Sequence, residues 1–484
     1  MKEFLPTSLP ERWQKRPLED VVLRMSNGIT KRQTKDGNGL PVSRIESISH
    51  GVVDMTRVGY LSGLSSSEVE NYRLKAGDIL FSHINSDLHL GKTAVFSLDS
   101  DTLLHGMNLL LIRVDSKKAL PAFLHWLFNF YRVGGLFMSI AQHAVNQSSI
   151  NQAKLKQLPV ILPPLPEQRR IVAEIEKQFT RLEAGVAALR RVRANLKRYR
   201  AAVLKAACEG RLVPTEAELN KSGSGVPPLG LGKKRQDTAS TFETGEALLA
   251  RILTERRKNW QGRGQYKEPA APDTKKLPPL PNGWTWATVE QLSTRVQYGS
   301  SAKTNEDSDG VPVLRMGNIQ EGKLDFDKLK YLLKVHDEFP ELLLARGDLL
   351  FNRTNSAELV GKTAVFKDTP NPCSFASYLI RVRFGGGCVS DFVSYYINSV
   401  FGRSWIADVV SQQVGQANVN GTKLQALAMP LSPLAEQTRI VAEVARRLSV
   451  VEELEAVVSA NLQRATRLRQ SILQKAFTGK LTKQ

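Results

Sequence analysis

The chain has 484 residues, with 67 Lys or Arg against 47 Asp or Glu, so its formal net charge is +20. This length allows roughly two to four domains, and the basic excess favours nucleic acid over a membrane as partner. Three cysteines without a C-x-x-C motif exclude a disulfide framework and a cysteine-rich zinc site. Because no apolar run approaches about 18 residues and the N-terminus lacks the apolar core of a signal peptide, we expect a soluble, cytoplasmic protein that does not bind a membrane.

Residues 1–163 predict a first globular unit. It opens with the sequence LPERW, which holds Leu9, Pro10 and Trp13. Turn residues separate its short β-type runs, and a helical, aromatic stretch follows them. The β-type runs are residues 39–45, 77–82, 92–98 and 108–114, and the helical stretch is 121–132. This order predicts a mixed α/β domain with a sheet and peripheral helices.

Residues 164–213 predict one long helix. Prolines stand where it starts, Gly210 stands where it stops, and only Gly185 interrupts the middle. Residues 214–279 then predict a linker, polar and rich in Gly, Ser, Pro and Lys from about 214 to 240. An amphipathic helix is expected within it at about 242–260, with extended chain from 261 onward.

Residues 280–432 repeat the first unit, and residues 433–484 repeat the long helix. LPNGW restates the opening with Leu280, Pro281 and Trp284, and residues 310–322 match 39–51. Residues 77–96 and 347–366 are identical at 12 of 20 positions, and residues 164–174 and 433–443 at 9 of 11. The chain is therefore a tandem duplication, a shared framework that presents two different surfaces.

The two long helices carry a narrow apolar stripe at heptad spacing. In the first helix the d positions are Ile175, Leu182, Leu189, Leu196 and Val203, and in the second they are Val444, Val451, Val458, Ala465 and Ile472. Such a stripe is buried against another helix or against the helix's own domain. We favour a helix pair, and two equivalent copies facing each other run antiparallel. Some 40 helical residues span roughly 60 Å, enough for a spacer.

Two motifs that suggest catalysis are weak. Gly91-Lys92-Thr93 and its copy at 361–363 lack the earlier glycine of a phosphate-binding loop, because Ser86 and Ser356 stand in its place. Asp309 with Glu321 and Lys323 only faintly resembles a metal-dependent nuclease, and the first repeat does not carry this set. No other catalytic or metal-binding motif appears, so we expect no catalytic residue, no metal site and no cofactor bound by this chain.

DNA-reading residue types occur in both units. Bases are read by Arg, Lys, Asn, Gln and His, while phosphates are held by Lys, Arg and hydroxyls. The first unit offers Lys31, Arg32, Gln33, Arg44, His83, Asn85, Lys92, Gln142, His143, Asn146 and Gln147. The second offers Lys303, Arg315, Arg353, Asn355, Lys362, Gln412, Gln413, Gln416 and Asn418. For each of these, an ordinary solvated side chain is the competing interpretation.

A comparison of the repeats sorts these candidates. Those that match in both units are Arg44/Arg315, Asn85/Asn355 and Lys92/Lys362, and they favour framework or backbone contacts. Those that differ, such as His83/Arg353, favour base choice. A basic face of the first long helix leaves three interpretations open, namely DNA binding, partner docking and plain solvent exposure. It comprises Arg190, Arg191, Arg193, Lys197, Arg198 and Arg200.

Taken together, the pattern resembles the specificity subunit of type I restriction-modification systems. The carrying features are the PL-x-EQ-x-R-IVAE helix starts at 164–174 and 433–443, the helix ends AVLKAACEGRLV and SILQKAFTGKLT, the GD-[IL]-LF runs and the LP-x-x-W openings. The resemblance covers nearly the whole chain. It implies two target-recognition domains, 1–163 and 280–432, each reading half of a split, asymmetric site in double-stranded DNA. The two helices would form an antiparallel coiled coil that sets the spacing.

The resemblance also implies partners. Two modification (methyltransferase) subunits would dock on the helices, and restriction (motor-nuclease) subunits would join that core. Catalysis would belong to these partners, which would use S-adenosylmethionine, ATP and Mg. Two rival hypotheses remain, a free-standing DNA-binding scaffold or regulator and a nuclease with dispersed catalytic residues.

Overall fold

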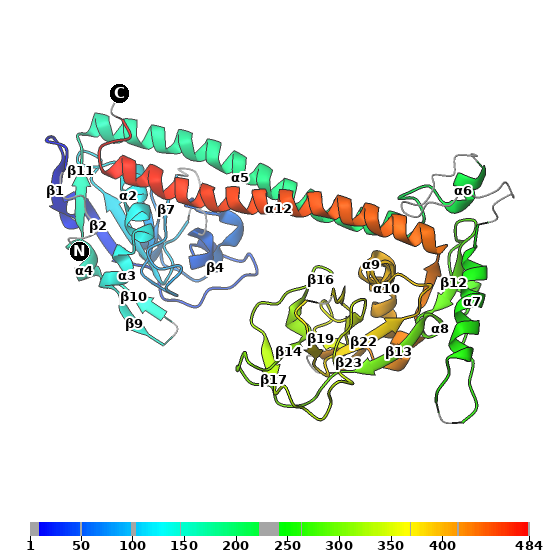
Figure 1. Cartoon of the computed structure of the whole chain (residues 1–484). Helices are drawn as coiled ribbons and strands as arrows, with labels where there is room; N and C mark the ends of the chain where they lie inside the picture. The colour runs from blue at the N-terminus through cyan, green and yellow to red at the C-terminus, as the bar shows by residue number, and fades with distance from the viewer. Residues whose placement is uncertain are drawn as a thin grey trace. The chain divides into compact units, whose positions relative to one another are not determined.

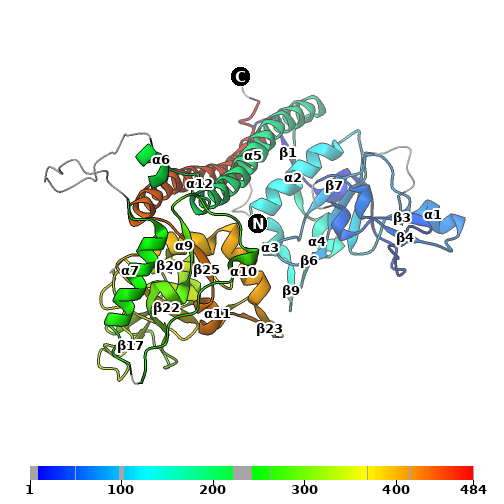
Figure 2. The same ribbon diagram turned by 90° about the vertical axis from the view of Figure 1, so that its right-hand side faces the viewer.

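The structure is a computed structural model that describes residues 9–48, 51–97, 103–145, 147–221, 242–262, 264–367, 369–413 and 416–482 (Figures 1 and 2). The chain divides into two compact units. Unit 1 comprises Met1–Arg191 and Val458–Gln484, and unit 2 comprises Val192–Val457. Each of the two long helices, α5 (Leu165–Cys208) and α12 (Leu434–Phe477), therefore contributes one end to each unit.

Unit 1 is a mixed α/β unit. Its strands are β1 (Gln14–Pro17), β2 (Val22–Asn27), β3 (Leu40–Val42), β4 (Gly59–Leu61), β5 (Ile79–Ser82), β6 (Ile84–Asn85), β7 (Thr93–Val95), β8 (Leu109–Val114), β9 (Gln142–Ala144), β10 (Gln147–Ser149) and β11 (Pro159–Leu162). Its shorter helices are η1 (Leu18–Val21), η2 (Ile45–Ile48), η3 (Met55–Arg57), α1 (Ser66–Tyr72), α2 (Pro121–Val133), α3 (Leu136–Ile140) and α4 (Gln152–Lys156).

Unit 2 repeats this plan with additions. Its strands are β12 (Thr285–Thr288), β13 (Ser293–Tyr298), β14 (Val311–Leu314), β15 (Ile319–Gln320), β16 (Lys323–Leu324), β17 (Lys330–Leu332), β18 (Leu349–Asn352), β19 (Thr354–Asn355), β20 (Thr363–Val365), β21 (Ser374–Phe375), β22 (Leu379–Phe384), β23 (Ser411–Gln413), β24 (Gln416–Asn418) and β25 (Ala428–Leu431). Its shorter helices are α6 (Glu216–Lys221), α7 (Gly245–Lys258), η4 (Thr274–Lys276), α8 (Val289–Leu292), η5 (Met316–Asn318), α9 (Ser390–Asn398), α10 (Val400–Val409) and α11 (Gly421–Gln425).

The central sheet has the same topology in both units. It is four-stranded and antiparallel, in the order β2-β8-β5-β7 in unit 1 and β13-β22-β18-β20 in unit 2. A buried aspartate supports each sheet in the same way, since Asp78 binds Arg113 at 2.7 Å and Asp348 binds Arg383 at 2.6 Å. The strands β5 and β18 are fully buried, as their continuous apolar runs predict.

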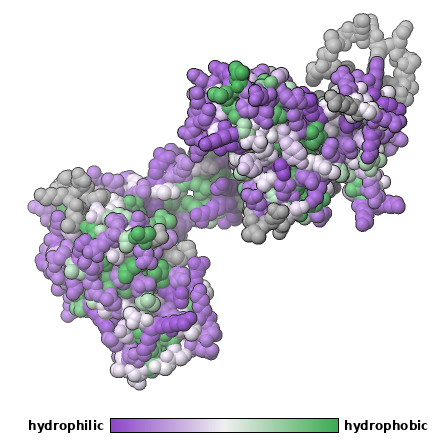
Figure 3. Space-filling model, turned by 90° about the horizontal axis from the view of Figure 1, so that it is seen from below, coloured by the Kyte–Doolittle hydropathy of each residue, from purple (hydrophilic) through white to green (hydrophobic). Residues whose placement is uncertain are grey.

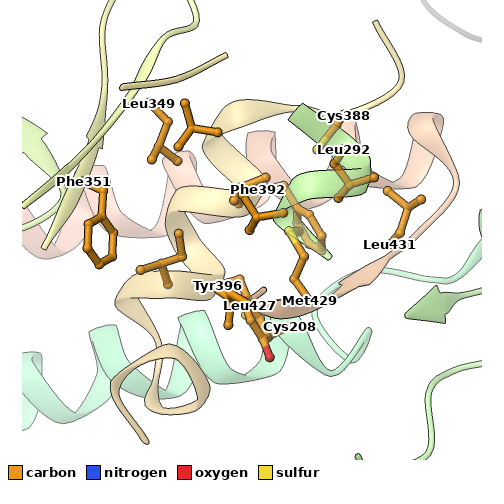
Figure 4. Close-up of a cluster of buried hydrophobic side chains, with 14 of the residues drawn as sticks. Cys208, Leu292, Leu349, Phe351, Cys388, Phe392, Tyr396, Leu427, Met429 and Leu431 are labelled. Atoms are coloured by element: carbon orange, nitrogen blue, oxygen red, sulfur yellow. The ribbon is translucent and has the colours of Figure 1, made fainter. Parts of the chain in front are cut away.

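Each core joins a sheet to the ends of both long helices. In unit 1, Phe81 and Phe123 cluster with Ile175 of α5 and Phe477 of α12. In unit 2 the core combines side chains of the sheet and α9 with Cys208 of α5 (Figure 4). Because unit 1 holds the start of α5 and the end of α12, and unit 2 holds the reverse, the two helices run antiparallel and lie side by side (Figures 1 and 2).

The predicted heptad stripe is buried at most of its d positions. In α5, Ile175, Leu196 and Val203 are buried, while Leu182 and Leu189 are partly exposed. In α12, Val444, Val451, Val458 and Ile472 are buried and Ala465 is partly exposed. Ion pairs flank the stripe, Glu183 with Arg469 at 2.6 Å and Arg200 with Glu455 at 3.2 Å. The predicted antiparallel coiled coil is confirmed.

The helix ends explain the repeated glycines and openings. Gly210 and Gly479 have φ values of 66° and 70°, and the next residue in each case donates its amide N–H to a carbonyl five residues back. This is the Schellman ending, which needs a left-handed residue. A Cβ on Gly210 would lie 2.6 Å from Cγ of Pro281, and one on Gly479 would lie 2.4 Å from Cγ of Pro10. The LP-x-x-W openings therefore pack against helix ends.

The tryptophans of the openings bind the helix starts. Trp13 donates its indole N–H to Glu167 of α5 at 3.1 Å, and Trp284 donates to Glu436 of α12 at 2.9 Å. Glu436 is fully buried, and this burial raises its pKa. Each opening thus contacts the end of one long helix and the start of the other.

The interval between the repeats agrees in part with the predicted linker. The expected helix at 242–260 is α7, which packs Leu248 and Ile252 into the unit 2 core. A further short helix, α6, lies in the stretch expected to be unstructured. Its first residue, Glu216, pairs its carboxylate with Arg439 and donates its backbone N–H to the carboxylate of Glu436. The stretch 222–241 lies outside the described residues.

The surface drawn in Figure 3 is mainly hydrophilic, with small, scattered apolar patches. Among the described helices, none combines the length and apolar character needed to cross a membrane. The three cysteines are buried and unpaired with one another, and burial raises the pKa of each thiol to about 12.

Candidate nucleic-acid interface

A small three-stranded sheet gathers several of the predicted DNA-reading residues of unit 1. Its strand order is β6-β10-β9, and all pairs are antiparallel. The ladder places Asn85, Ser148 and His143 in one row across the three strands, so their side chains leave the same face. Gln142, His143 and Gln147 are exposed, and Val145 at the hairpin turn is 92% exposed. Asn146 lies outside the described residues.

Unit 2 builds the same sheet from β19, β24 and β23. The corresponding row is Asn355, Ala417 and Gln412. Gln413 pairs with Gln416 in the hairpin, and Asn418 donates its side-chain amide to Thr354 at 2.9 Å. The structure thus brings candidates from distant parts of the sequence onto one small sheet in each unit. The hairpins β9-β10 and β23-β24 of these sheets are two-stranded β-ribbons, an element that the DNA major groove admits.

His83 and Arg353 occupy matching positions just before β6 and β19. The backbone carbonyl of His83 accepts from the amide of Ile150, and that of Arg353 accepts from the amide of Val419. Burial lowers the pKa of His83 to about 4, which keeps the imidazole neutral near pH 7. The Arg353 guanidinium instead lies 4.8 Å from the ring centre of Tyr298, a stacking that fixes its plane. The same framework position therefore carries a neutral ring in one unit and a cation in the other.

The matched candidates make contacts within their own units. Asn85 and Asn355 each accept the amide N–H of the following serine at 2.9 Å, which fixes the turn after the strand. Arg44 and Arg315 both precede a 3-10 helix, and their backbone amides are capped by Ser47 and Asn318. The side chains of Asn85 and Asn355 thus have a structural role. The Arg44 side chain binds Glu46 at 3.2 Å, and that of Arg315 donates to the carbonyl of Lys328 at 2.9 Å.

The lysines of the matched turn lie beside the small sheets. The carbonyls of Lys92 and Lys362 accept from the amides of Ser82 and Asn352, each at the end of a central strand. Lys92 is partly buried, and this burial, together with nearby Arg132, lowers its pKa. Lys92 and Lys362 therefore lie in the turns that precede β7 and β20. Each turn is bonded to the residue just before His83 or Arg353.

The remaining candidates lie on other loops. Lys31 is paired with Glu68 at 2.7 Å, Arg32 is exposed, and Gln33 is half-buried beside Arg44. Lys303 is exposed on the loop after β13. Lys31 would have to exchange its carboxylate for a phosphate to bind DNA.

The basic face of α5 is largely exposed. Arg190, Arg191, Arg193, Lys197 and Arg198 are exposed, whereas Arg200 binds Glu455 at 3.2 Å and Glu321 at 3.4 Å. Arg200 thus belongs to the packing of unit 2. The residues that faintly resemble a nuclease set also have structural roles, since Glu321 binds Arg200 and Lys323 binds Glu452 at 2.6 Å. Within the described ranges, no group of three or more His, Cys, Asp or Glu side chains is placed to hold a metal ion.

Sequence reasoning missed Ser148, Asp87 and Tyr298. Ser148 bonds both His143 and Asp87, and Tyr298 lies under Arg353. For Ser148 and Asp87 a signal was present, because unit 2 has alanines, Ala417 and Ala357, at the matching positions. Nothing in the sequence indicated the stacking of Tyr298, which depends on the tertiary fold.

These features define a class of protein: a tandem pair of α/β units, each with a polar β-ribbon, joined by an antiparallel helix pair. Residues 10–188 match the family model described as the type I restriction modification DNA specificity domain. A chain from a solved structure of a type I restriction-modification system has the same fold, with a TM-score of 0.62 and 20% identity over 98% of this chain and all of that one.

The curated relatives agree with this match. A Methanocaldococcus jannaschii protein, assigned as the specificity subunit of a type I restriction enzyme, MjaX, is 46% identical over 36% of this chain and 41% of its own length. The EcoKI specificity subunit of Escherichia coli is 25% identical over 70% of this chain and 61% of its own length. The StySPI specificity subunit of Salmonella potsdam is 23% identical over 98% of this chain and 90% of its own length. The chain is thus similar to type I restriction-modification specificity subunits, and it spans 41% and 61% of the length of the first two of these relatives.

Proposed function

We propose that the chain is the DNA sequence-recognition subunit of a type I restriction-modification complex. Each unit reads one half of a split, asymmetric site in double-stranded DNA. The observation that carries this proposal is the small sheet repeated in both units, with different residues at matching positions: His143 and Ser148 in one, Gln412 and Ala417 in the other. Two copies of one framework that differ at matching positions of these sheets suit two different half-sites. The net charge of +20 suits a phosphate backbone.

The antiparallel helix pair sets the spacing between half-sites and docks two methyltransferase subunits, and restriction subunits join that core. The chain itself is non-catalytic in this proposal, and its partners bind S-adenosylmethionine, ATP and Mg. The names of the relatives support a role within such a system. The exposed arginines on α5 from Arg190 to Arg198 offer a charged surface that a protein partner or DNA would cover.

Co-purification from the native host tests this proposal. We expect the chain to bring down two methyltransferase subunits, identified by mass spectrometry. Mapping of methylated adenine in the host genome should show a split, asymmetric motif that disappears when the gene is deleted. Recovery of the chain alone, with genomic methylation unchanged by the deletion, would contradict the proposal and favour a free-standing DNA-binding scaffold.

A further inference from the structure

We propose that His143 is a specificity-determining residue of unit 1, and that Ser148 and Asp87 fix it as a hydrogen-bond acceptor for an exocyclic amino group of cytosine or adenine in the major groove. This inference rests on the proposed function, because it assigns the chemistry of one contact within the first half-site. It concerns a chain of hydrogen bonds on the small sheet β6-β10-β9.

The direction of these hydrogen bonds follows from the groups involved. The Ser148 hydroxyl lies at hydrogen-bond distance from the Asp87 carboxylate and 2.8 Å from Nδ1 of His143. A carboxylate only accepts, and a hydroxyl has one proton to donate. Ser148 therefore donates to Asp87 and accepts from His143, so Nδ1 of His143 carries a proton.

The protonated Nδ1 decides what the other ring nitrogen does. In a neutral imidazole one nitrogen donates and the other accepts, so Nε2 of His143 is an acceptor. The His143 side chain is 55% exposed, and Asp87 is 66% exposed. Ser148, between them, is 2% exposed. The buried Ser148 hydroxyl thus fixes the orientation of the His143 ring through Nδ1, while the ring itself remains partly exposed to solvent.

An acceptor on the ribbon discriminates between bases. In the major groove, cytosine presents the N4 amino group and adenine the N6 amino group as donors, whereas guanine O6 and N7 and thymine O4 only accept. A fixed acceptor at His143 therefore favours cytosine or adenine at one position and places two acceptors face to face at guanine or thymine. Without Ser148, the ring exchanges its proton between nitrogens and loses this preference.

Unit 2 lacks this hydrogen-bond chain. Ala417 stands at the position of Ser148, and Ala357 at that of Asp87, as the register of the two small sheets and the repeat alignment show. Gln412 occupies the position of His143. An amide needs no fixed tautomer, because it carries a donor and an acceptor together. The inference is thus confined to the first half-site, and unit 2 provides natural replacements for testing it.

Selection of bound duplexes from a randomised DNA pool, with sequencing, tests the inference on the full-length chain in its co-purified complex. We expect the wild type to prefer cytosine or adenine at one position of one half-site. Ser148→Ala, the unit 2 residue, should reduce that preference about tenfold and leave every other position unchanged. Asp87→Asn should lower the same preference by a smaller factor, because its amide can either accept from Ser148 or donate to it and so no longer fixes the direction of the bond. His143→Gln should change the preference at this position to adenine alone. Adding Asp87→Asn to His143→Gln should leave that adenine preference unchanged.

Asp20→Asn is the matched control, because it also removes one exposed carboxylate from unit 1. It should leave all base preferences unchanged. If the wild type selects a split site and Ser148→Ala and Asp87→Asn leave each of its positions unchanged, the inference is overturned while the proposed function stands. The inference is also overturned if the wild type prefers guanine or thymine at the position whose preference changes in His143→Gln. Failure of the complex to select any sequence would overturn both.

Discussion

Under the proposed function, Arg353 and Lys362 are assigned two different kinds of DNA contact in unit 2. The Arg353 guanidinium is held against the ring of Tyr298, and this fixed orientation suits a directional contact with a base edge. Lys362 lies in the turn before β20, and its ammonium group is of the kind that binds a DNA phosphate. We predict that Arg353→Ala costs about 1–3 kcal/mol at one base pair of the second half-site. Lys362→Ala should weaken binding to all DNA sequences alike. It should also reduce the slope of the logarithm of the binding constant against the logarithm of the salt concentration by about one.

Binding isotherms at several salt concentrations, on the cognate duplex and on single-base variants, measure both effects. The matched turn of unit 1 supplies a control, since Lys92→Ala should behave like Lys362→Ala. A uniform loss of affinity for Arg353→Ala across all base variants would show that this side chain contacts only the backbone.

Two buried histidines give unit 1 a stability that depends on pH. His105 binds the carbonyl of Leu109, and His125 binds the Thr93 hydroxyl at 2.9 Å. Burial lowers the pKa of each to about 4 from the ordinary 6.5. Because the folded pKa lies below the unfolded one, their contribution is present above pH 6.5 and is lost as the pH falls through 4. We predict that unit 1 loses up to about 3 kcal/mol per histidine across this window.

The repeat offers a variant for this prediction. Ser394 stands at the position of His125, and its hydroxyl lies 3.1 Å from that of Thr363. Urea unfolding followed by hydrogen exchange of unit 1 peptides between pH 7 and pH 4 should therefore show a shallower pH dependence in His125→Ser. An equally steep dependence in that variant would mean that His125 is not a source of the acid sensitivity.

At the scale of elements, the ends of α12 and α5 belong to the cores of the two units. Phe477 is fully buried and packs its ring against Phe123 and Phe130, each with a centroid distance of 5.4 Å. Removal of such a side chain leaves a cavity that the surrounding helices fill only in part. We predict that Phe477→Ala destabilises unit 1 by about 3–5 kcal/mol.

Hydrogen exchange of peptides from α2 measures the stability of unit 1 separately from that of unit 2, because α2 belongs to unit 1. Leu468→Ala is the control on the same helix, because Leu468 is 48% exposed, and it should change stability by less than about 0.5 kcal/mol. A similar loss for both variants would contradict the assignment of Phe477 to the unit 1 core.

The elements also show how far the sequence predicts this fold. Both long helices and the repeated strand runs follow from the sequence, because heptad spacing and continuous apolar runs are local properties. The two long helices end at Cys208 and Phe477, just before Gly210 and Gly479, the glycines at which the sequence predicts that they stop, because both glycines adopt the left-handed conformation that ends a helix. The helix α6 was not predicted, since its contacts with Arg439 and Glu436 join residues more than 200 positions apart.

At the scale of the whole molecule, the helix pair is the proposed ruler between half-sites. Deletion of one heptad from each helix, Leu189–Asn195 and Val458–Arg464, keeps the apolar stripe in phase. At about 1.5 Å per residue this removes roughly 10 Å, or about three base pairs of B-DNA. We predict that the variant recognises both half-sites with a spacer about three base pairs shorter, as read from selected duplexes or from the methylated motif.

Deletion from one helix alone is the control, since it breaks the alignment of the two stripes and should abolish stable folding. A spacer that stays unchanged in the double deletion would contradict the ruler. Loss of one half-site with the other retained would instead show that the two units read DNA independently.

The sequence by itself determined the duplication, the two long helices, the strand runs and the basic character of the chain, because each depends on local spacing or on composition. The tertiary structure decided which side chains meet. Asn85 and His143 share one row of a sheet only because β10 pairs with both β6 and β9, and a shift of one residue would turn either side chain to the other face. The contact between Ser148 and Asp87 likewise joins residues 61 positions apart. Strand register therefore decides that Ser148 lies beside His143, and local sequence patterns do not specify this register.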